Sequence, residues 1–309
     1  AADLAEDIQL EVAYELGITW QEEGKNRIVS DRTHAVAAAH AYRVEDLATA
    51  LFPEDTGETE GFLVRQNLDR LSLRLRFPLA DLILGRQAIA WGSGRVTNPT
   101  DVLVPFVFTA LDQEERFGVD AVRMRIPFGA LNEFDLGVVG GDEADPAASA
   151  AFVRSRFYWR QTDIALIGMA FREHLMLGVD VARALGEAGV WLEAAAVDTG
   201  AFGSETGRDD RDYARVTTGV DYQLTPALYG FAEYHFSSAG SSDAGDVMRL
   251  SNDAAYVDGA VYLLGRHYAA VGAVYQWTGL TVLSGSVLVN LHDGSAILTP
   301  AVEMNVARN

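Results

Sequence analysis

The 309-residue sequence has no cysteine, few basic residues and no apolar run long enough to form a transmembrane helix. Without cysteine the chain has no disulfide, no thiolate metal ligand and no cysteine nucleophile. A membrane-spanning helix needs a run of about 18 or more apolar residues, and none occurs although 49% of the residues are hydrophobic. The net charge of -20 argues against a nucleic-acid partner, because phosphate backbones attract basic surfaces.

The sequence also lacks the spacings that mark common catalytic sites. Its six histidines are scattered and none lies in the HExxH spacing of a zinc site; they are His34, His40, His174, His235, His267 and His292. Ser295 lies near Asp293 and His292, but successive residues of a strand point to opposite faces, so these three cannot form a triad directly. Asp293-Gly294 is instead typical of a tight hairpin turn. We therefore expect no enzymatic activity, no metal ion and no cofactor.

What the chain does contain is alternation of apolar and polar residues with a period of two. The clearest case has apolar residues at Ile8, Leu10, Val12, Tyr14, Leu16, Ile18 and Trp20. In a strand this places all apolar side chains on one face. The same pattern predicts strands over 7–20, 28–38, 40–51, 67–77, 79–90, 118–127, 131–140, 151–160, 162–171, 174–184, 188–198, 212–224, 227–237, 257–277 in part, 280–291 and 295–306. The alanines of 27–52 fit a short helix equally well.

The connections between these segments alternate in length. Short links fall at Pro78, 128–130, Gln161, 186–189, 225–226 and 278–279, and longer ones at 52–66, 91–117, 141–150, 199–211 and 238–256. Bacterial membrane barrels place short turns on one side and long loops on the other. We therefore predict one domain over 1–309, an all-β transmembrane antiparallel β-barrel of about 16 strands, with 14 to 18 open.

A soluble β-sandwich would show the same alternation with its apolar face turned inward. Three features favour the membrane barrel. The segments outnumber those of one sandwich, the polar faces are rich in charge, and aromatic residues cluster near segment ends, as at a membrane interface. These aromatic residues are Trp20, Phe77, Trp91, Trp159, Tyr222, Tyr234, Phe236 and Trp277.

The start of the sequence fits a processed chain, whereas its end differs from that of many outer-membrane barrels. The start, Ala1-Ala2-Asp3, has the small residues that cleavage by a signal peptidase leaves, so we expect a mature chain. The end, Val306-Ala307-Arg308-Asn309, lacks the final aromatic residue of many outer-membrane barrels. Either the natural chain continues past Asn309 or its assembly signal is unusual.

One segment resembles a known family. The stretch 84–106, with Gly85-Arg86-Gln87, Trp91-Gly92, Asn98-Pro99-Thr100-Asp101 and Pro105, is similar to the "GRQ…WG…NPTD…P" segment of proteobacterial outer-membrane barrels related to the alginate-export family. The segment 290–296 is similar to a hairpin near the C-terminus of such proteins. The resemblance implies a family of pores. Some members of that family export anionic polysaccharide, and many have no known cargo.

The residues of this segment also support a separate interpretation. Gly92 and Gly94 allow backbone angles that a β-carbon forbids, and Asn98-Pro99-Thr100-Asp101 is typical of a turn. The loop 91–117 is longer than a simple connection requires and carries an apolar stretch from Val102 to Phe108. We expect it to fold into the lumen or cap it and to form a constriction; the alternative is that it only stabilises the inner wall. The predicted constriction residues are Arg86, Trp91, Arg95, Asn98, Asp101 and Phe106.

Arginines gather on the polar faces of three predicted strands. The predicted lumen residues are Arg70, Arg74 and Arg76 on one strand, Arg123 and Arg125 on a second, Arg154, Arg156 and Arg160 on a third, and the acids Glu133 and Asp135 between the last two. Paired charges that stiffen the wall are one explanation. An excess of guanidinium groups that attracts anions is the other. Acids at Glu11, Glu15, Glu193, Asp221 and Glu233 could line an opposite wall.

From these patterns we expect a bacterial outer-membrane pore for passive passage of small or extended anionic solutes. The expected partners are outer-membrane lipid, lipopolysaccharide and the anionic solute, and no nucleic acid is expected. The acidic clusters at 54–60, 142–145 and 209–212 would face the lipopolysaccharide. An alternative is a plugged barrel that acts as a membrane scaffold for a partner protein. A third is a soluble all-β protein.

Overall fold

A computed structural model describes residues 2–5, 7–21, 42–45, 49–52, 61–104, 117–203, 211–250 and 252–306. These residues form sixteen strands. The strands are β1 Ala2–Ala5, β2 Ile8–Gln21, β3 Thr49–Phe52, β4 Gly61–Arg76, β5 Asp81–Ala88, β6 Gly118–Phe128, β7 Asn132–Val139, β8 Ala150–Trp159, β9 Thr162–Phe171, β10 His174–Leu185, β11 Ala188–Asp198, β12 Tyr213–Thr225, β13 Leu228–Ser237, β14 His267–Thr278, β15 Thr281–Asn290 and β16 Ala296–Met304.

Helical structure in the described residues is confined to short pieces. They are the 3-10 turns η1 Asp142–Ala144, η2 Pro146–Ala148 and η3 Ala244–Asp246 and the α-helices α2 Val247–Leu250 and α3 Ala254–Val257. Within the part of the chain that is described, no helix has the length and apolar character needed to cross a membrane.

The chain groups into two compact units. Unit 1 comprises Ala1–Ala90, Thr109–Ser155 and Met169–Glu173, and unit 2 comprises Trp91–Phe108, Arg156–Gly168 and His174–Asn309. Strands β8 and β9 each contribute residues to both units.

Unit 1 contains an antiparallel sheet in the order β1-β2-β4-β5-β6-β7, and β3 also pairs with β4. Each long strand therefore pairs with the next long strand along the chain. The turn between β4 and β5 is closed by backbone hydrogen bonds between Phe77 and Ala80, and Gly129 starts the next short turn with a φ of 68°. The links at the other ends of these strands are longer, at 89–117 and 140–149.

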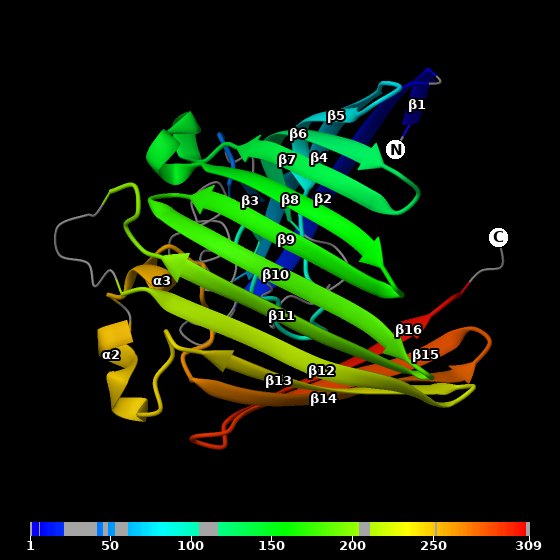
Figure 1. Cartoon of the computed structure of the whole chain (residues 1–309), viewed down its shortest axis with the longest axis vertical. Coiled ribbons are helices and arrows are strands. Elements are labelled where there is room, and N and C mark those ends of the chain that lie inside the picture. The colour runs from blue at the N-terminus through cyan, green and yellow to red at the C-terminus, as the bar shows by residue number, and fades with distance from the viewer. Residues whose placement is uncertain are drawn as a thin grey trace. The chain divides into compact units, whose positions relative to one another are not determined.

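Unit 2 contains a second run of antiparallel strands, in which β10 to β16 pair in chain order. Figure 1 shows β10, β11, β12 and β13 side by side in this order. Two-residue turns join β10 to β11, β12 to β13 and β14 to β15. The links 199–212 and 238–266, at the opposite strand ends, are longer.

Exposure in unit 1 is the reverse of that in a soluble sheet. Val12 and Ile18 of β2 and Val138 of β7 are 52%, 66% and 60% exposed, whereas Asp69 of β4 and Asp135 of β7 are 7% and 1% exposed. Apolar side chains therefore cover the exposed face, and charged side chains lie on the buried face. A soluble protein normally buries the first kind and exposes the second.

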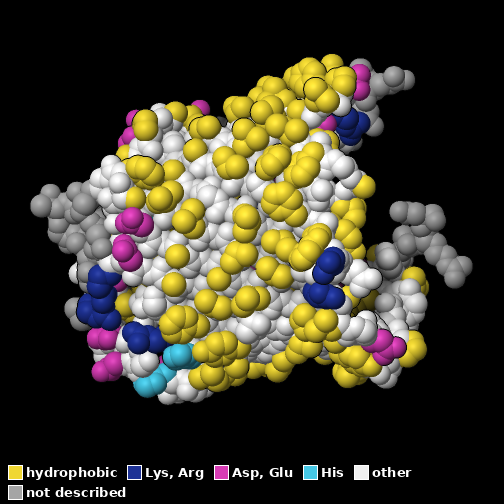
Figure 2. Space-filling model, in the orientation of Figure 1, with side chains coloured by type: hydrophobic (Ala, Val, Ile, Leu, Met, Phe, Trp, Pro, Cys, Tyr) yellow, Lys and Arg dark blue, Asp and Glu magenta, His cyan; other side chains and the backbone are white. Residues whose placement is uncertain are grey.

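The same inversion holds in unit 2. Leu177 of β10 and Val271 of β14 are 64% and 58% exposed, whereas Glu193 of β11, Arg215 of β12 and Glu233 of β13 are at most 5% exposed. Figure 2 shows apolar side chains spread over the strands, with acidic and basic side chains gathered toward the strand ends. Below, the two sides of each sheet are called the apolar face and the polar face.

The predicted fold class, an all-β antiparallel structure of about 16 strands, is confirmed. The described strands match the predicted segments from 67–77 onward, usually within two residues. The segment 28–38 lies outside the described residues. The prediction for 40–51 is wrong in part, since Tyr42–Glu45 is not a strand and β3 begins only at Thr49.

Candidate functional site

The described part of the predicted constriction loop, Trp91–Val104, lies on the polar face of β10, β11, β12 and β13 in unit 2. It is called the inner segment below. Its residues Thr97, Thr100 and Asp101 and the apolar run Val102–Val104 are all buried. Asp101 donates its backbone N–H to the carbonyl of Asn98 at 3.2 Å, which closes the predicted turn.

Glu193 of β11 binds the inner segment at two points. Its Oε1 accepts hydrogen bonds from the backbone nitrogen of Thr100 at 2.8 Å and from the Thr100 hydroxyl at 2.7 Å. Its Oε2 lies 3.5 Å from the backbone nitrogen of Gly94. Glu193 itself is fully buried, so these donors satisfy a carboxylate that has no access to water.

Glu233 of β13 binds the residues between Gly94 and Thr100. Its Oε2 accepts from the backbone nitrogen of Arg95 at 2.6 Å, and its Oε1 accepts from those of Val96 and Thr97 at 3.2 and 2.9 Å. The hydroxyl of Thr97 adds a fourth donor at 3.2 Å. A carboxylate surrounded by successive backbone N–H groups makes strong charge-assisted hydrogen bonds, so Glu193 and Glu233 together hold the backbone from Gly94 to Thr100.

Side-chain contacts complete the attachment. Arg95 Nη2 donates to Asp221 Oδ2 of β12 at 2.6 Å, and its guanidinium lies 5.2 Å from the ring centroid of Trp191. Burial lowers the pKa of Arg95, but the hydrogen bond to Asp221 and the nearby Tyr229 outweigh it, so the pKa lies above its ordinary value. Arg215 Nη2 donates to the carbonyl of Pro99 at 2.5 Å.

Gly92 is required by the close approach of the inner segment to the wall. Its φ is 113°, a backbone conformation that residues with a β-carbon rarely adopt. A β-carbon there would stand 2.3 Å from Asn98 Oδ1 and 2.6 Å from Glu193 Oε2. The sequence-based argument for a glycine at this position is confirmed.

Two buried histidines, His235 and His174, take part in separate hydrogen bonds. His235 Nδ1 lies 2.8 Å from the hydroxyl of Thr217, which in turn lies 3.0 Å from that of Thr97. His174 Nε2 lies 2.8 Å from Asp258 Oδ2, and its Nδ1 accepts from the backbone nitrogen of Gly200 at 3.1 Å. Across the described ranges, no group of three or more histidine, aspartate or glutamate side chains is arranged to hold a metal ion.

In unit 1 the predicted arginines meet acids of neighbouring strands. Arg123 donates to both oxygens of Asp135 at 2.8 and 2.6 Å, and Arg125 donates to Glu133 at 2.6 Å. The structure therefore brings together the two arginines of β6 and the two acids of β7. The guanidinium side chains remain 14% and 32% exposed, so they are paired but also within reach of solvent.

Arg70 of β4 pairs with two acids, Glu11 of β2 at 3.3 Å and Asp69 of its own strand at 3.4 Å. The expectation that Glu11 belongs to an opposite acidic wall is therefore wrong, because β2 is the direct neighbour of β4. Arg76 donates to the side-chain oxygen of Gln9 at 3.3 Å. Arg74 is half-buried on the same strand.

The arginines near β8 divide between the strand and its turn. Arg154 and Arg156 are half-buried within β8. The prediction that Arg160 shares their face is wrong, because Arg160 lies in the turn after β8 with a φ of 49°. Its guanidinium lies 4.9 Å from the ring centroid of Trp159, an exposed residue.

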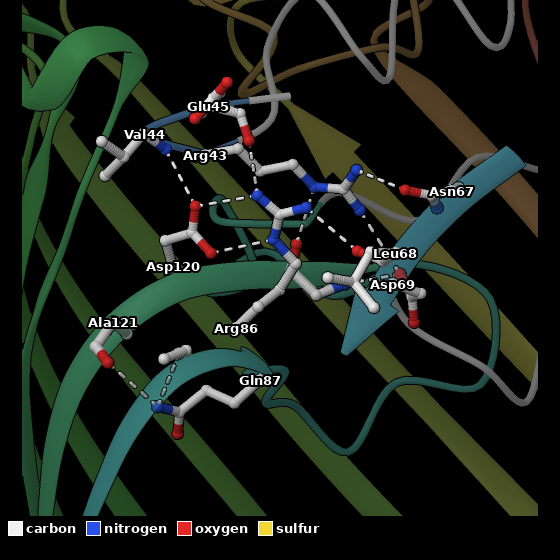
Figure 3. Close-up of polar contacts among 12 residues, drawn as sticks. Arg43, Val44, Glu45, Asn67, Leu68, Asp69, Arg86, Gln87, Asp120 and Ala121 are labelled. Carbon is white, nitrogen blue, oxygen red and sulfur yellow. Dashed lines mark hydrogen bonds and ion pairs between the residues drawn. The ribbon is translucent and has the colours of Figure 1, made fainter. Parts of the chain in front are cut away.

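Arg86 was predicted with the constriction residues, but it belongs to β5 in unit 1. It donates to both oxygens of Asp120 at 2.8 and 2.9 Å and to the carbonyls of Leu68 and Glu45 at 3.0 and 2.6 Å. Figure 3 shows this arrangement beside Arg43. Trp91, Arg95, Asn98 and Asp101 do lie together in the inner segment, and Phe106 lies outside the described residues.

The sequence analysis did not identify Arg43, Asn67 and Asp69, which lie near Arg86 (Figure 3). Arg43 donates to Asn67 at 2.9 Å and lies 3.4 Å from Asp69 (Figure 3). Asp69 points to the polar face because β4 has a bulge there: Ala13 pairs with Arg70 and Tyr14 with Leu68, which leaves Asp69 as the extra residue. A bulge reverses the alternation of faces, and no residue pattern of the sequence marks it.

Comparison with known proteins gives matches of structure only. No family model and no curated protein matches the chain. Similar solved structures include OmpT, an outer membrane protein of Vibrio cholerae, with 9% identity over 76% of each chain and a TM-score of 0.47. A mutant of the Rh. blastica porin has 12% identity over 82% of this chain and 80% of its own, with a TM-score of 0.49.

A third similar structure is OccK3 (OpdO) of Pseudomonas aeruginosa. It has 11% identity over 71% of this chain and 62% of its own, with a TM-score of 0.46. At such identities, no functional residue is transferred from these proteins to the present chain.

Proposed function

We propose that this chain is a β-barrel pore of a bacterial outer membrane, through which small or extended anionic solutes pass passively. The observation that carries the proposal is the inverted distribution of side chains in both units. Exposed apolar faces are unfavourable in water but favourable in hydrocarbon. Buried and half-buried arginines, aspartates and glutamates on the opposite face fit a water-containing interior.

The positions of aromatic side chains support a membrane location. Phe77, Trp159 and Trp277 are 55%, 61% and 63% exposed, and each lies at or next to a short turn. Tyrosine and tryptophan favour the level of the lipid head groups, where one part of the ring is in hydrocarbon and another in water. The short turns would then mark one membrane surface, and the longer links the other.

The charges of the polar face support a preference for anions. Arg123 and Arg125 are matched by acids, but Arg74 and Arg156 form no ion pair with a described residue. Their positive charge would attract anions more strongly than in bulk water, because neither the wall nor the lipid behind it screens well. The inner segment would narrow the passage beside the acids Glu193 and Glu233.

The test is ion selectivity in a planar bilayer under a salt gradient. The purified wild type is expected to conduct with a reversal potential that indicates anion preference. The double variant R74Q/R156Q is expected to shift that potential toward cations while still conducting. R160Q is the matched control, because Arg160 lies in a turn against Trp159, and it should leave the potential unchanged.

A cation preference in the wild type, or an unchanged potential in R74Q/R156Q, would contradict the assignment of anion selectivity. A second candidate function is a plugged barrel that holds a partner protein at the membrane. The packing of Val102, Leu103 and Val104 within unit 2, each at most 8% exposed, favours it. Silent bilayers together with a co-purifying partner would support the scaffold over the pore.

A further inference from the structure

Unit 2 contains a cavity of about 310 Å³ near the ends of β14, β15 and β16. One wall comes from the link 238–266, and the other from β15, the turn after it and the first residues of β16. Ligand pockets in proteins begin at about this size and combine an apolar interior with a few polar groups. This cavity is separate from the residues that hold the inner segment.

The floor of the cavity is apolar and lies on the inner side of the sheet. Leu263, Tyr268 and Leu288 line it and pack together with Val96 and Ala270 as buried residues. Tyr268 and Leu288 share the buried face of β14 and β15, whereas Val271 is exposed on the opposite face. The floor of the cavity therefore lies on the side of the sheet opposite to the apolar face.

Backbone hydrogen bonds hold the wall formed by the link in place. Ser241 and Gly265 form a parallel bridge, with Ser241 N donating to the carbonyl of Leu264 at 2.9 Å and Arg266 N donating to that of Ser241 at 3.2 Å. The backbone nitrogen of Gly265 donates to the hydroxyl of Tyr268 at 2.7 Å. A ligand would thus meet a largely formed site.

The rim of the cavity is acidic. Asp243 and Asp293 line it, with His292 next to Asp293, and no lysine or arginine is found among the lining residues of the described chain. Each aspartate accepts hydrogen bonds through Oδ1: Asp243 accepts from Gly245 N at 2.8 Å, and Asp293 accepts from the nitrogen and hydroxyl of Ser295 at 2.8 and 2.7 Å. The hydrogen bonds from Ser295 lower the pKa of Asp293. Oδ2 of each aspartate makes no hydrogen bond or ion pair with another described residue, and it can accept from an external cation.

We propose that this cavity binds a small amphipathic amine, with its apolar body on Leu263, Tyr268 and Leu288 and its ammonium group at Asp243 and Asp293. The apolar floor selects the body, and the acidic rim selects a positive charge over a negative one.

The probe is 2-phenylethylammonium, titrated calorimetrically into the full chain in maltoside micelles. Saturable binding is expected, with 2-phenylethanol weaker and 3-phenylpropanoate not bound. An exposed charge pair contributes up to about 1 kcal/mol, or about fivefold in affinity, so D243N/D293N, which removes two such pairs, should bind about 5-fold to 25-fold more weakly. D163N, an exposed aspartate at the start of β9 that does not line the cavity, is the matched control.

A second variant tests the cavity itself. Ile297 of β16 lines it and pairs with Leu288 of the floor, so I297W should abolish binding by filling the space. Equal binding of the amine and the carboxylate, unchanged affinity in D243N/D293N or I297W, or no saturable binding would overturn the proposal. An ethanolamine lipid head group carries the same ammonium, so the titration is repeated in nanodiscs with and without phosphatidylethanolamine. Unchanged binding supports a soluble amine, and loss of binding in its presence would assign the cavity to lipid and overturn the proposal.

Discussion

Oε1 of Glu193 accepts two hydrogen bonds from one residue, the backbone N–H of Thr100 at 2.8 Å and its hydroxyl at 2.7 Å. Both groups are buried. A buried carboxylate without such donors would cost several kcal/mol. The position of the inner segment and the burial of Glu193 therefore depend on each other.

Replacing Glu193 by glutamine should loosen the inner segment. The amide keeps one acceptor for Thr100, but it removes the acceptor for the backbone N–H of Gly94 and turns a donor toward it. A buried donor left without an acceptor costs about 1–3 kcal/mol, so the free energy of unfolding should fall by about that amount. Urea unfolding followed by tryptophan fluorescence measures it. E143Q, at an exposed site in η1, should have no effect, and an equal loss in both variants would refute the contact's role.

Replacing Gly92 by alanine should displace the inner segment. The new β-carbon would meet Asn98 Oδ1 at 2.3 Å in a backbone conformation with φ of 113°. Strain of this kind costs about 1–3 kcal/mol, and the clash adds to it. Gly279, in the turn after β14, has no atom within 4 Å of its ideal β-carbon, so G279A is the control. Similar melting temperatures for the two variants would show that Gly92 is not constrained.

Arg123 and Arg125 should differ in their importance for stability. Asp135 is 1% exposed and depends on Arg123, whereas the side chain of Glu133 is 13% exposed beside Arg125. Breaking a buried pair costs about 3–5 kcal/mol, so R123Q should destabilise the chain far more than R125Q. The double variant R123Q/D135N should recover part of the loss, because it removes the unpaired buried charge. Chemical unfolding of all three variants in one detergent measures these losses of stability. A loss for R125Q as large as that for R123Q would contradict the prediction.

Replacing Val271 by arginine distinguishes a lipid-facing surface from a water-facing one. Val271 is 58% exposed in the middle of β14. An arginine that faces hydrocarbon at mid-strand costs about 2–4 kcal/mol, and one near the interface about 0–1 kcal/mol. V271R should therefore fold poorly into liposomes, and T225R, at the turn end of β12, should fold well. Equal folding yields of V271R and the wild type would argue that this face contacts water.

The alternation of residues predicted the strands well, because a period of two is imposed by backbone geometry alone. The pairs Arg123–Asp135 and Arg125–Glu133 could also be predicted from the sequence, because the short turn after Phe128 aligns β6 directly with β7. The length and the apolar stretch of the loop 91–117 led to the expectation that it folds into the lumen or caps it, with packing on the inner wall as the alternative; its described part, Trp91–Val104, is hydrogen-bonded to β11 and β13.

Other contacts depend on local geometry that residue patterns do not specify. The bulge at Asp69 turns a residue inward against the alternation, and the left-handed φ of Arg160 removes it from the strand. The sequence marked Glu193 and Glu233 only as wall acids. Their donors are backbone N–H groups, which every residue except proline carries, so composition could not indicate that these acids hold the inner segment.

Glu233 holds the inner segment through main-chain amides at Arg95, Val96 and Thr97. Amides are the same for nearly every amino acid, so the anchoring does not depend on most of the side chains that these residues carry. Exchange of the side chain at Arg95 would therefore alter the charge beside Asp221, while the backbone remained hydrogen-bonded to Glu233.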